Sequence, residues 1–148
     1  MKHTVVSLLS RQAQCVLATQ GDQGVGLHLM AYAFSDDVSN IYIASLANTQ
    51  KVSNMRSRPN VTCLWDNRTG NNSDHVEGLA MSGFGQALEL TNKAEQSAFG
   101  RLLERNASLK NLLSQPSVVI FAIQIDRYQW VEGYTRSMIY KPEKNCGS

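Results

Sequence analysis

The sequence predicts a mainly β fold, a closed or partly closed antiparallel barrel with flanking helices. About seven short apolar segments of strand length are joined mostly by polar turns, and the few helical patterns fall at corners between them. A chain of 148 residues fits a single domain, which we place at 1–140. The charged stretch 141–148 is expected to be a mobile tail.

The first third of the chain is expected to contain one helix and three strands. Apolar residues at helical spacing predict a helix over 3–13, and the apolar run 15–19 predicts a short buried strand. A turn with two glycines follows at 20–24. In residues 27–34, leucine and alanine alternate with larger side chains, which predicts a strand that is at least partly covered on both faces. The next strand is expected over 40–45.

A short helix is expected over 49–58, because Pro59 disfavours helical geometry at the residue before it. Residues 61–65 form the next strand, and the polar segment 66–75 is too long for a tight hairpin, so it is a candidate functional loop.

The long apolar segment 79–90 is expected to be a strand, in which Gly83 and Gly85 indicate a bulge or a barrel corner. The remaining expected elements are a helix capped by Thr91, a short helix over 108–114, and strands over 118–125 and 129–134.

Composition argues against several classes of protein. The net charge of +2 gives no general reason to expect binding to nucleic acid or to a membrane surface. The longest apolar run, 118–123, is far shorter than a membrane span. Cys15 and Cys63 lie within apolar runs, as core thiols do in a reducing compartment. We therefore expect a cytoplasmic protein. The histidines are scattered and the cysteines lack metal-like spacing, so no metal site is expected.

The most informative segment is 41–61, which predicts a strand, a polar turn, a short basic helix and another strand. A side-chain oxygen of Asn48 or Thr49 can cap the helix. Free amides at a helix N-terminus, flanked by hydroxyl groups and a lysine, suit a phosphate group. The side chains that flank this N-terminus are Ser45, Thr49 and Lys51.

The order of these segments resembles the flavin-binding split barrel of the pyridoxamine 5′-phosphate oxidase-like family, over about residues 12–134. The resemblance rests on Cys-Val-Leu-Ala-Thr at 15–19, Ile-Tyr-Ile-Ala-Ser at 41–45, Thr-Gln-Lys at 49–51 and Arg-Pro-Asn-Val at 58–61. It implies an FMN-dependent oxidoreductase that forms a homodimer, holds the flavin at the subunit interface and reacts with a small-molecule redox partner. Neither the substrate nor a catalytic side chain follows from it.

The resemblance also implies which residues contact the flavin. The phosphate would be held by Ser45, Thr49, Gln50 and Lys51. The better-known oxidases have a serine-arginine-lysine run where this chain has Thr49-Gln50-Lys51, so one charge-assisted phosphate contact is missing. Arg56 and Arg68 are the candidates to replace it.

Three further segments are implied at the flavin. They are the strand residues His28, Leu29, Met30 and Ala31 along the ring edge, the loop residues Asn67, Arg68 and Thr69, and Trp130 near the C-terminus. The structural alternatives are ordinary barrel core for the strand, a hydrated loop, and simple packing for the tryptophan.

Three other functions stay open at the level of the sequence. One is a non-catalytic flavin- or haem-binding protein. Another is a deazaflavin-dependent reductase, since similar barrels bind deazaflavin with a related phosphate corner. The third is an empty barrel that serves as a dimeric interaction module.

Overall fold

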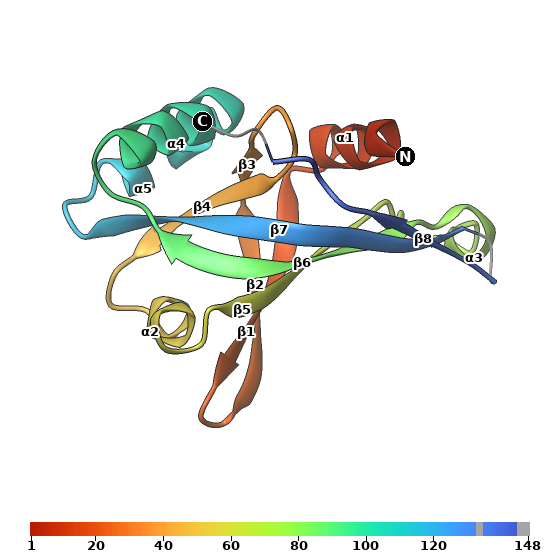
Figure 1. Ribbon diagram of the computed structural model, residues 1–148, viewed down its shortest axis with the longest axis horizontal. Helices are drawn as coiled ribbons and strands as arrows, with labels where there is room; N and C mark the ends of the chain where they lie inside the picture. Colours follow the sequence, from red (N-terminus) through yellow and green to blue (C-terminus); the bar gives the residue numbers. More distant parts are fainter. Residues whose placement is uncertain (133–134, 145–148) are drawn as a thin grey trace.

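Eight antiparallel strands form one sheet in the computed structural model, which describes residues 1–132 and 135–144. The strands are β1 Gln14–Gly21, β2 Gly24–Ala31, β3 Ala33–Phe34, β4 Asn40–Leu46, β5 Asn60–Asp66, β6 Ala80–Glu89, β7 Val118–Glu132 and β8 Arg136–Tyr140. Their order is β2-β1-β5-β6-β7-β4-β3, and β8 pairs with β7 (Figure 1). The predicted antiparallel, mainly β fold is confirmed.

The sheet curls because two of its most distant strands are almost continuous in the chain. β2 and β3 stand at opposite ends of the strand order, yet only Tyr32 separates them. The end of β2 and the start of β3 are therefore two Cα steps apart, at most about 7.6 Å, so the two ends of the sheet must approach each other. The result is a half-barrel, as expected for a split barrel.

Helices cover both sides of this sheet. They are α1 Lys2–Arg11, α2 Gln50–Ser57, α3 Asp74–Glu77, α4 Asn92–Arg105 and α5 Lys110–Leu113, with a 3₁₀ turn, η1, at Ala107–Leu109. In Figure 1, α1 and α4 lie above the long strand β7, whereas α2 and the β1–β2 hairpin lie below it. None of the helices described is both long and apolar enough to cross a membrane.

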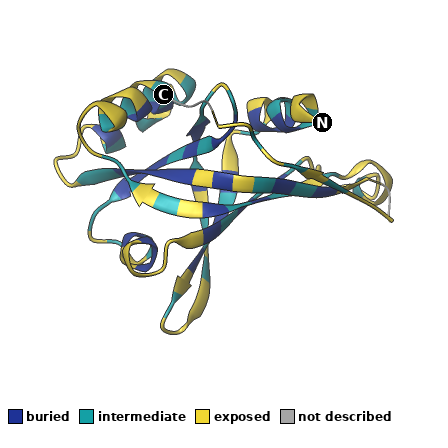
Figure 2. Ribbon diagram, viewed as in Figure 1, coloured by how far each residue is buried: buried dark blue, intermediate teal, exposed yellow. Residues whose placement is uncertain are grey.

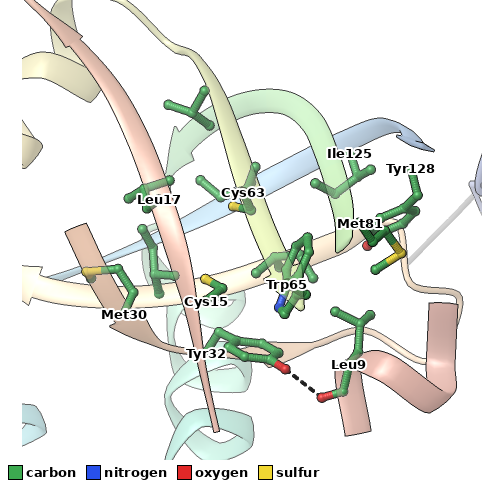
Figure 3. Close-up of a cluster of buried hydrophobic side chains, with 14 of the residues drawn as sticks. Leu9, Cys15, Leu17, Met30, Tyr32, Cys63, Trp65, Met81, Ile125 and Tyr128 are labelled. Carbon is green, nitrogen blue, oxygen red and sulfur yellow. Dashed lines mark hydrogen bonds between the residues drawn. The ribbon is translucent and has the colours of Figure 1, made fainter. Parts of the chain in front are cut away.

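Aliphatic, sulfur-containing and aromatic side chains fill the core between α1 and the sheet (Figure 3). The Trp65 ring lies 5.8 Å from the Tyr32 ring and 5.9 Å from the Tyr128 ring, and all three side chains are buried. The Tyr32 hydroxyl donates to the backbone oxygen of Leu9 at 2.6 Å, which ties α1 to the point where β2 meets β3. Burial of each large side chain stabilises the fold by about 1.5–3 kcal/mol.

The C-terminal strands differ from the sequence prediction. The two strands expected over 118–125 and 129–134 are one strand, β7, as far as the described residues extend, and β8 was not predicted. In the pairing of β6 with β7, Phe84 lies opposite Arg127 and Gly85 opposite Ile125, so Asp126 is an extra residue. The polar Asp126 interrupts the alternation of side chains along β7, and the sequence pattern therefore predicted two strands. This irregularity confirms the predicted bulge, and a Cβ atom on Gly85 would collide with the carbonyl oxygen of Gln124.

Two other predictions were wrong in detail. The outward side chains of β2 are not covered in the single chain, since Val25, Leu27 and Leu29 are 66–70% exposed (Figure 2). The expected polar loop contains a helical turn, α3. Thr91 does occupy the N-cap of α4, although its side chain makes no capping hydrogen bond. Residues 141–144 are irregular, and the rest of the expected tail lies outside the described residues.

Candidate functional site

The first turn of α2 has the features expected of a phosphate site. Thr49 is the N-cap residue, but its hydroxyl donates to the Leu46 carbonyl at 3.0 Å and does not cap an amide, so the predicted capping bond is absent. The first helical hydrogen bond runs from the Ser53 amide to the Thr49 carbonyl. The amides of residues 50–52 precede this bond and therefore lack intrahelical acceptors.

Ser45 completes this corner from the end of β4. Its Oγ atom lies 3.1 Å from Oγ1 of Thr49, and both side chains are half-buried or buried. The side chain of Lys51 is half-buried, and no hydrogen bond or ion pair joins its ammonium group to the part of the chain that the structure describes. Two hydroxyl groups, free amides and a cation therefore converge at one helix N-terminus.

A groove of about 380 Å³ joins this corner to β2. It is lined by Gln14, Leu29, Met30, Ala31, Ala44, Ser45, Leu46, Thr49, Lys51, Leu109 and Leu112. Six of these residues were predicted at the cofactor from two separate sequence segments. The polar groups lie at the helix N-terminus and the remainder of the lining is mostly apolar, a combination common in ligand sites.

His28 and Gln50 line a different groove. It has a volume of about 390 Å³ and lies beside the turn of the β1–β2 hairpin. The Gln50 side chain donates to Oδ1 of Asn54 at 2.8 Å. His28 Nε2 lies 3.0 Å from Oγ1 of Thr19. Burial, and secondarily the charge of Lys51, lower the pKa of His28 below its ordinary value. The structure thus divides the predicted cofactor residues of β2, β4 and α2 between two grooves.

The loop residues Asn67, Arg68 and Thr69 lie near α3, at the end of the molecule opposite α2 (Figure 1). Asn67 accepts from the Leu79 amide at 2.6 Å and donates to the Glu77 carbonyl at 3.2 Å. The Thr69 hydroxyl donates to Asp74 at 2.7 Å. These bonds shape the loop beside a third groove, of about 350 Å³. Within one chain this groove is separate from α2 and from the phosphate corner.

Trp130 lies in the core. Its side chain is 2% exposed and its Nε1 atom donates to Glu132 at 3.3 Å. Within one chain, Trp130 therefore packs in the core, which was the alternative to contact with the flavin.

Neither candidate replacement for the missing arginine is available as a free cation. Arg56 makes two hydrogen bonds to Glu89, at 2.7 and 3.1 Å. Arg68 pairs with Asp66 at 2.7 Å. The cation that remains at the phosphate corner is Lys51.

Sequence reasoning missed Thr19 and Asn54. Asn54 is 6% exposed and donates to the fully buried Thr19 hydroxyl at 3.0 Å. The spacing of Gln50 and Asn54, four residues apart on one helix, is a signal that could have indicated their contact. Leu109 and Leu112 were also missed, because their approach to the groove depends on how η1 and α5 pack against the sheet.

No protein-family model and no curated protein matches this sequence. Several solved structures share its fold. A haem-binding protein from Mycobacterium smegmatis matches with a TM-score of 0.79 and 14% identity over 90% of this chain, which spans 55% of that protein. General stress protein 26 from Bacillus anthracis matches with a TM-score of 0.73 and 17% identity, over 95% of this chain and 97% of that one.

A candidate pyridoxamine 5′-phosphate oxidase from Listeria innocua matches with a TM-score of 0.68 and 14% identity, over 88% of this chain and 97% of that one. At these identities the matches show the fold alone. They agree with the split barrel expected from the sequence.

Proposed function

We propose that this protein binds FMN and is an oxidoreductase that works as a homodimer. The observation that carries the proposal is the 380 Å³ groove, in which residues of β2 meet the hydroxyl groups and the ammonium group at the start of α2. The resemblance implied both parts at a flavin from separate segments of the sequence, and in the structure they line one groove.

The residues present fit a flavin phosphate. Ser45 and Thr49 can rotate their hydroxyl groups toward phosphate oxygens, and the amides at the start of α2 point along the helix axis toward the same position. Lys51 adds a charge that no described carboxylate neutralises. The backbone of residues 29–31 would lie along the ring, and the bound flavin would supply the redox chemistry.

The exposed side chains of β2 support a homodimer. Val25, Leu27 and Leu29 alternate along an edge strand and form an apolar row. Exposed apolar edges of this kind invite pairing or coverage. A second copy that covers this row would also supply a second wall to the groove, and its loop 67–69 is our candidate for that wall.

Haem binding is a second candidate, favoured by the similarity in fold to a protein described as haem-binding. A deazaflavin with the same phosphate would use the same corner as FMN.

An absorption spectrum of the purified recombinant protein, followed by mass spectrometry of what heat releases, tests the proposal. A yellow protein that releases FMN would support it. A released deazaflavin or a Soret band would replace FMN by the corresponding candidate, and a colourless protein that takes up no added flavin would overturn the proposal.

A further inference from the structure

A chain of three hydrogen bonds links the start of α2 to β2 through β1. Gln50 Nε2 donates to Asn54 Oδ1 at 2.8 Å, and Asn54 Nδ2 donates to Thr19 Oγ1 at 3.0 Å. Thr19 Oγ1 lies 3.0 Å from His28 Nε2. Thr19 is fully buried and Asn54 is 6% exposed, so the middle of this series of hydrogen bonds has almost no access to solvent.

The orientations of the Gln50 and Asn54 amide groups decide which atom donates in each of these hydrogen bonds. Since Thr19 Oγ1 accepts from Asn54, its own proton needs another acceptor, and a buried hydroxyl without one costs about 1–3 kcal/mol. His28 Nε2 is the one acceptor that the described residues offer this proton. With the Asn54 amide in this orientation, Thr19 donates to Nε2, and the ring proton of neutral His28 lies on Nδ1.

Two glycines leave room for this arrangement. A Cβ atom on Gly26 would lie 3.2 Å from His28 Nε2, and one on Gly21 would lie 3.0 Å from Asn54 Oδ1. Both distances are tighter than ordinary van der Waals contact, so side chains at these positions would press on the hydrogen-bonded atoms. The β1–β2 hairpin is thus shaped around the polar chain.

The charged groups around His28 also favour the neutral ring. Lys51 of α2 is a cation near the imidazole. Asp22 of the hairpin turn lines the same groove, but it pairs with Arg58 at 2.7 Å. Protonation of His28 would require Nε2 to become a donor, and it would leave the Thr19 proton without an acceptor.

We propose that Thr19 and Asn54 are positioning residues that hold His28 as the neutral Nδ1–H tautomer, so that its side chain offers a hydrogen-bond donor to a ligand in the hairpin groove. No described residue bonds to Nδ1. The ligand atom that suits this donor is an acceptor, such as a carbonyl, carboxylate or phosphate oxygen. The hairpin groove is not the groove proposed for the flavin, so the tautomer and the ligand that it suits are independent of FMN binding.

The tautomer can be measured without any ligand, by long-range ¹H–¹⁵N correlation spectra of ¹⁵N-labelled protein at neutral pH, with His28→Gln to assign the ring. We expect Nδ1 protonated and Nε2 unprotonated in the wild type. Thr19→Val keeps the shape of the side chain but removes the hydroxyl, so the ring should relax to a mixture of tautomers. Thr19→Ser is the matched control and should keep the wild-type pattern.

Asn54→Asp should reverse the donor and acceptor roles in the hydrogen bonds that Thr19 makes. A carboxylate at this position accepts the Thr19 proton, so Thr19 would then accept from His28 Nε2. We expect the Nε2–H tautomer and a His28 pKa raised by about one unit or more, since the charged ring gains an acceptor. Backbone amide spectra would show that each variant is folded.

An Nε2–H tautomer in the wild type would overturn the proposal, because it requires both amides to be turned. So would a Thr19→Val protein with the wild-type pattern, or an unchanged tautomer in folded Asn54→Asp. FMN binding is measured separately. An Nδ1–H tautomer in a protein that binds no flavin would contradict the proposed function and leave the positioning roles of Thr19 and Asn54 supported.

Discussion

The Oγ atom of Ser45 lies 3.1 Å from Oγ1 of Thr49, across the turn that joins β4 to α2. If both hydroxyl groups bind the flavin phosphate, Ser45→Ala and Thr49→Val should each weaken FMN binding about two- to tenfold, the value of one hydrogen bond. Riboflavin, which lacks the phosphate, should bind equally to wild type and variants. Fluorescence titration measures both affinities, with Ser57→Ala at the exposed end of α2 as the control.

Lys51 is the cation that the structure leaves at the phosphate corner. Replacement by glutamine should weaken FMN binding by about tenfold or more, because hydrogen bonds to charged groups contribute about 1.5–3 kcal/mol. The wild-type affinity should also fall with added salt more steeply than that of Lys51→Gln. Lys93→Gln, on α4, is the matched control. Equal affinity of Lys51→Gln and the wild type would refute the phosphate assignment.

The apolar row on β2 should hold two copies together. Leu27 is 70% exposed in the single chain, and a lysine there would place a charge in the proposed interface. We expect Leu27→Lys to sediment as a monomer and the wild type as a dimer. Leu88→Lys, at a 48% exposed position of β6, is the control and should remain dimeric. A monomeric wild type, or a dimeric Leu27→Lys, would contradict the assignment of this surface.

Tyr32 should stabilise the closure of the barrel. Its hydroxyl contacts the backbone oxygens of Leu9 and Gln12, so Tyr32→Phe should lower the free energy of unfolding by about 1 kcal/mol at neutral pH. Tyr140→Phe, whose hydroxyl makes no such bond among the described residues, should change it little. Urea denaturation measures both.

The stability difference between wild type and Tyr32→Phe should also depend on pH. Burial raises the pKa of Tyr32 to about 12, against an opposing effect of Arg105. Because the folded pKa lies above the unfolded one, the stability due to the neutral phenol is complete below about pH 10 and is lost toward pH 12. Over this range the wild type should lose stability faster than Tyr32→Phe. Parallel curves would contradict the assigned burial effect.

Local elements of this fold could be predicted from the sequence. The strand, turn and helix of residues 41–61 depend on nearby signals, such as Pro59 at the end of α2, and the structure has all three. The paired glycines of β6 correctly indicated a bulge. The convergence of Ser45, Thr49 and Lys51 followed from the same local pattern.

Features set by long-range pairing could not be predicted. β7 was divided in two because the extra residue Asp126 breaks its alternation, and the reason lies in its pairing with β6. The bonds of Asn54 to Thr19, and of Thr19 to His28, join residues that only the packing of α2 on the hairpin brings together. Neither the outward exposure of β2 nor the separation of Gln50 from the phosphate corner has a local signal.

In the function proposed here, the groove between β2 and α2 holds a flavin through its phosphate. The most direct test is the binding of FMN and of riboflavin to the same preparation of wild-type protein, freed of any bound cofactor. We predict that FMN binds at least about tenfold more tightly, the difference that one or two charge-assisted contacts make. Equal affinities for the two, or no binding of either, would contradict this proposal.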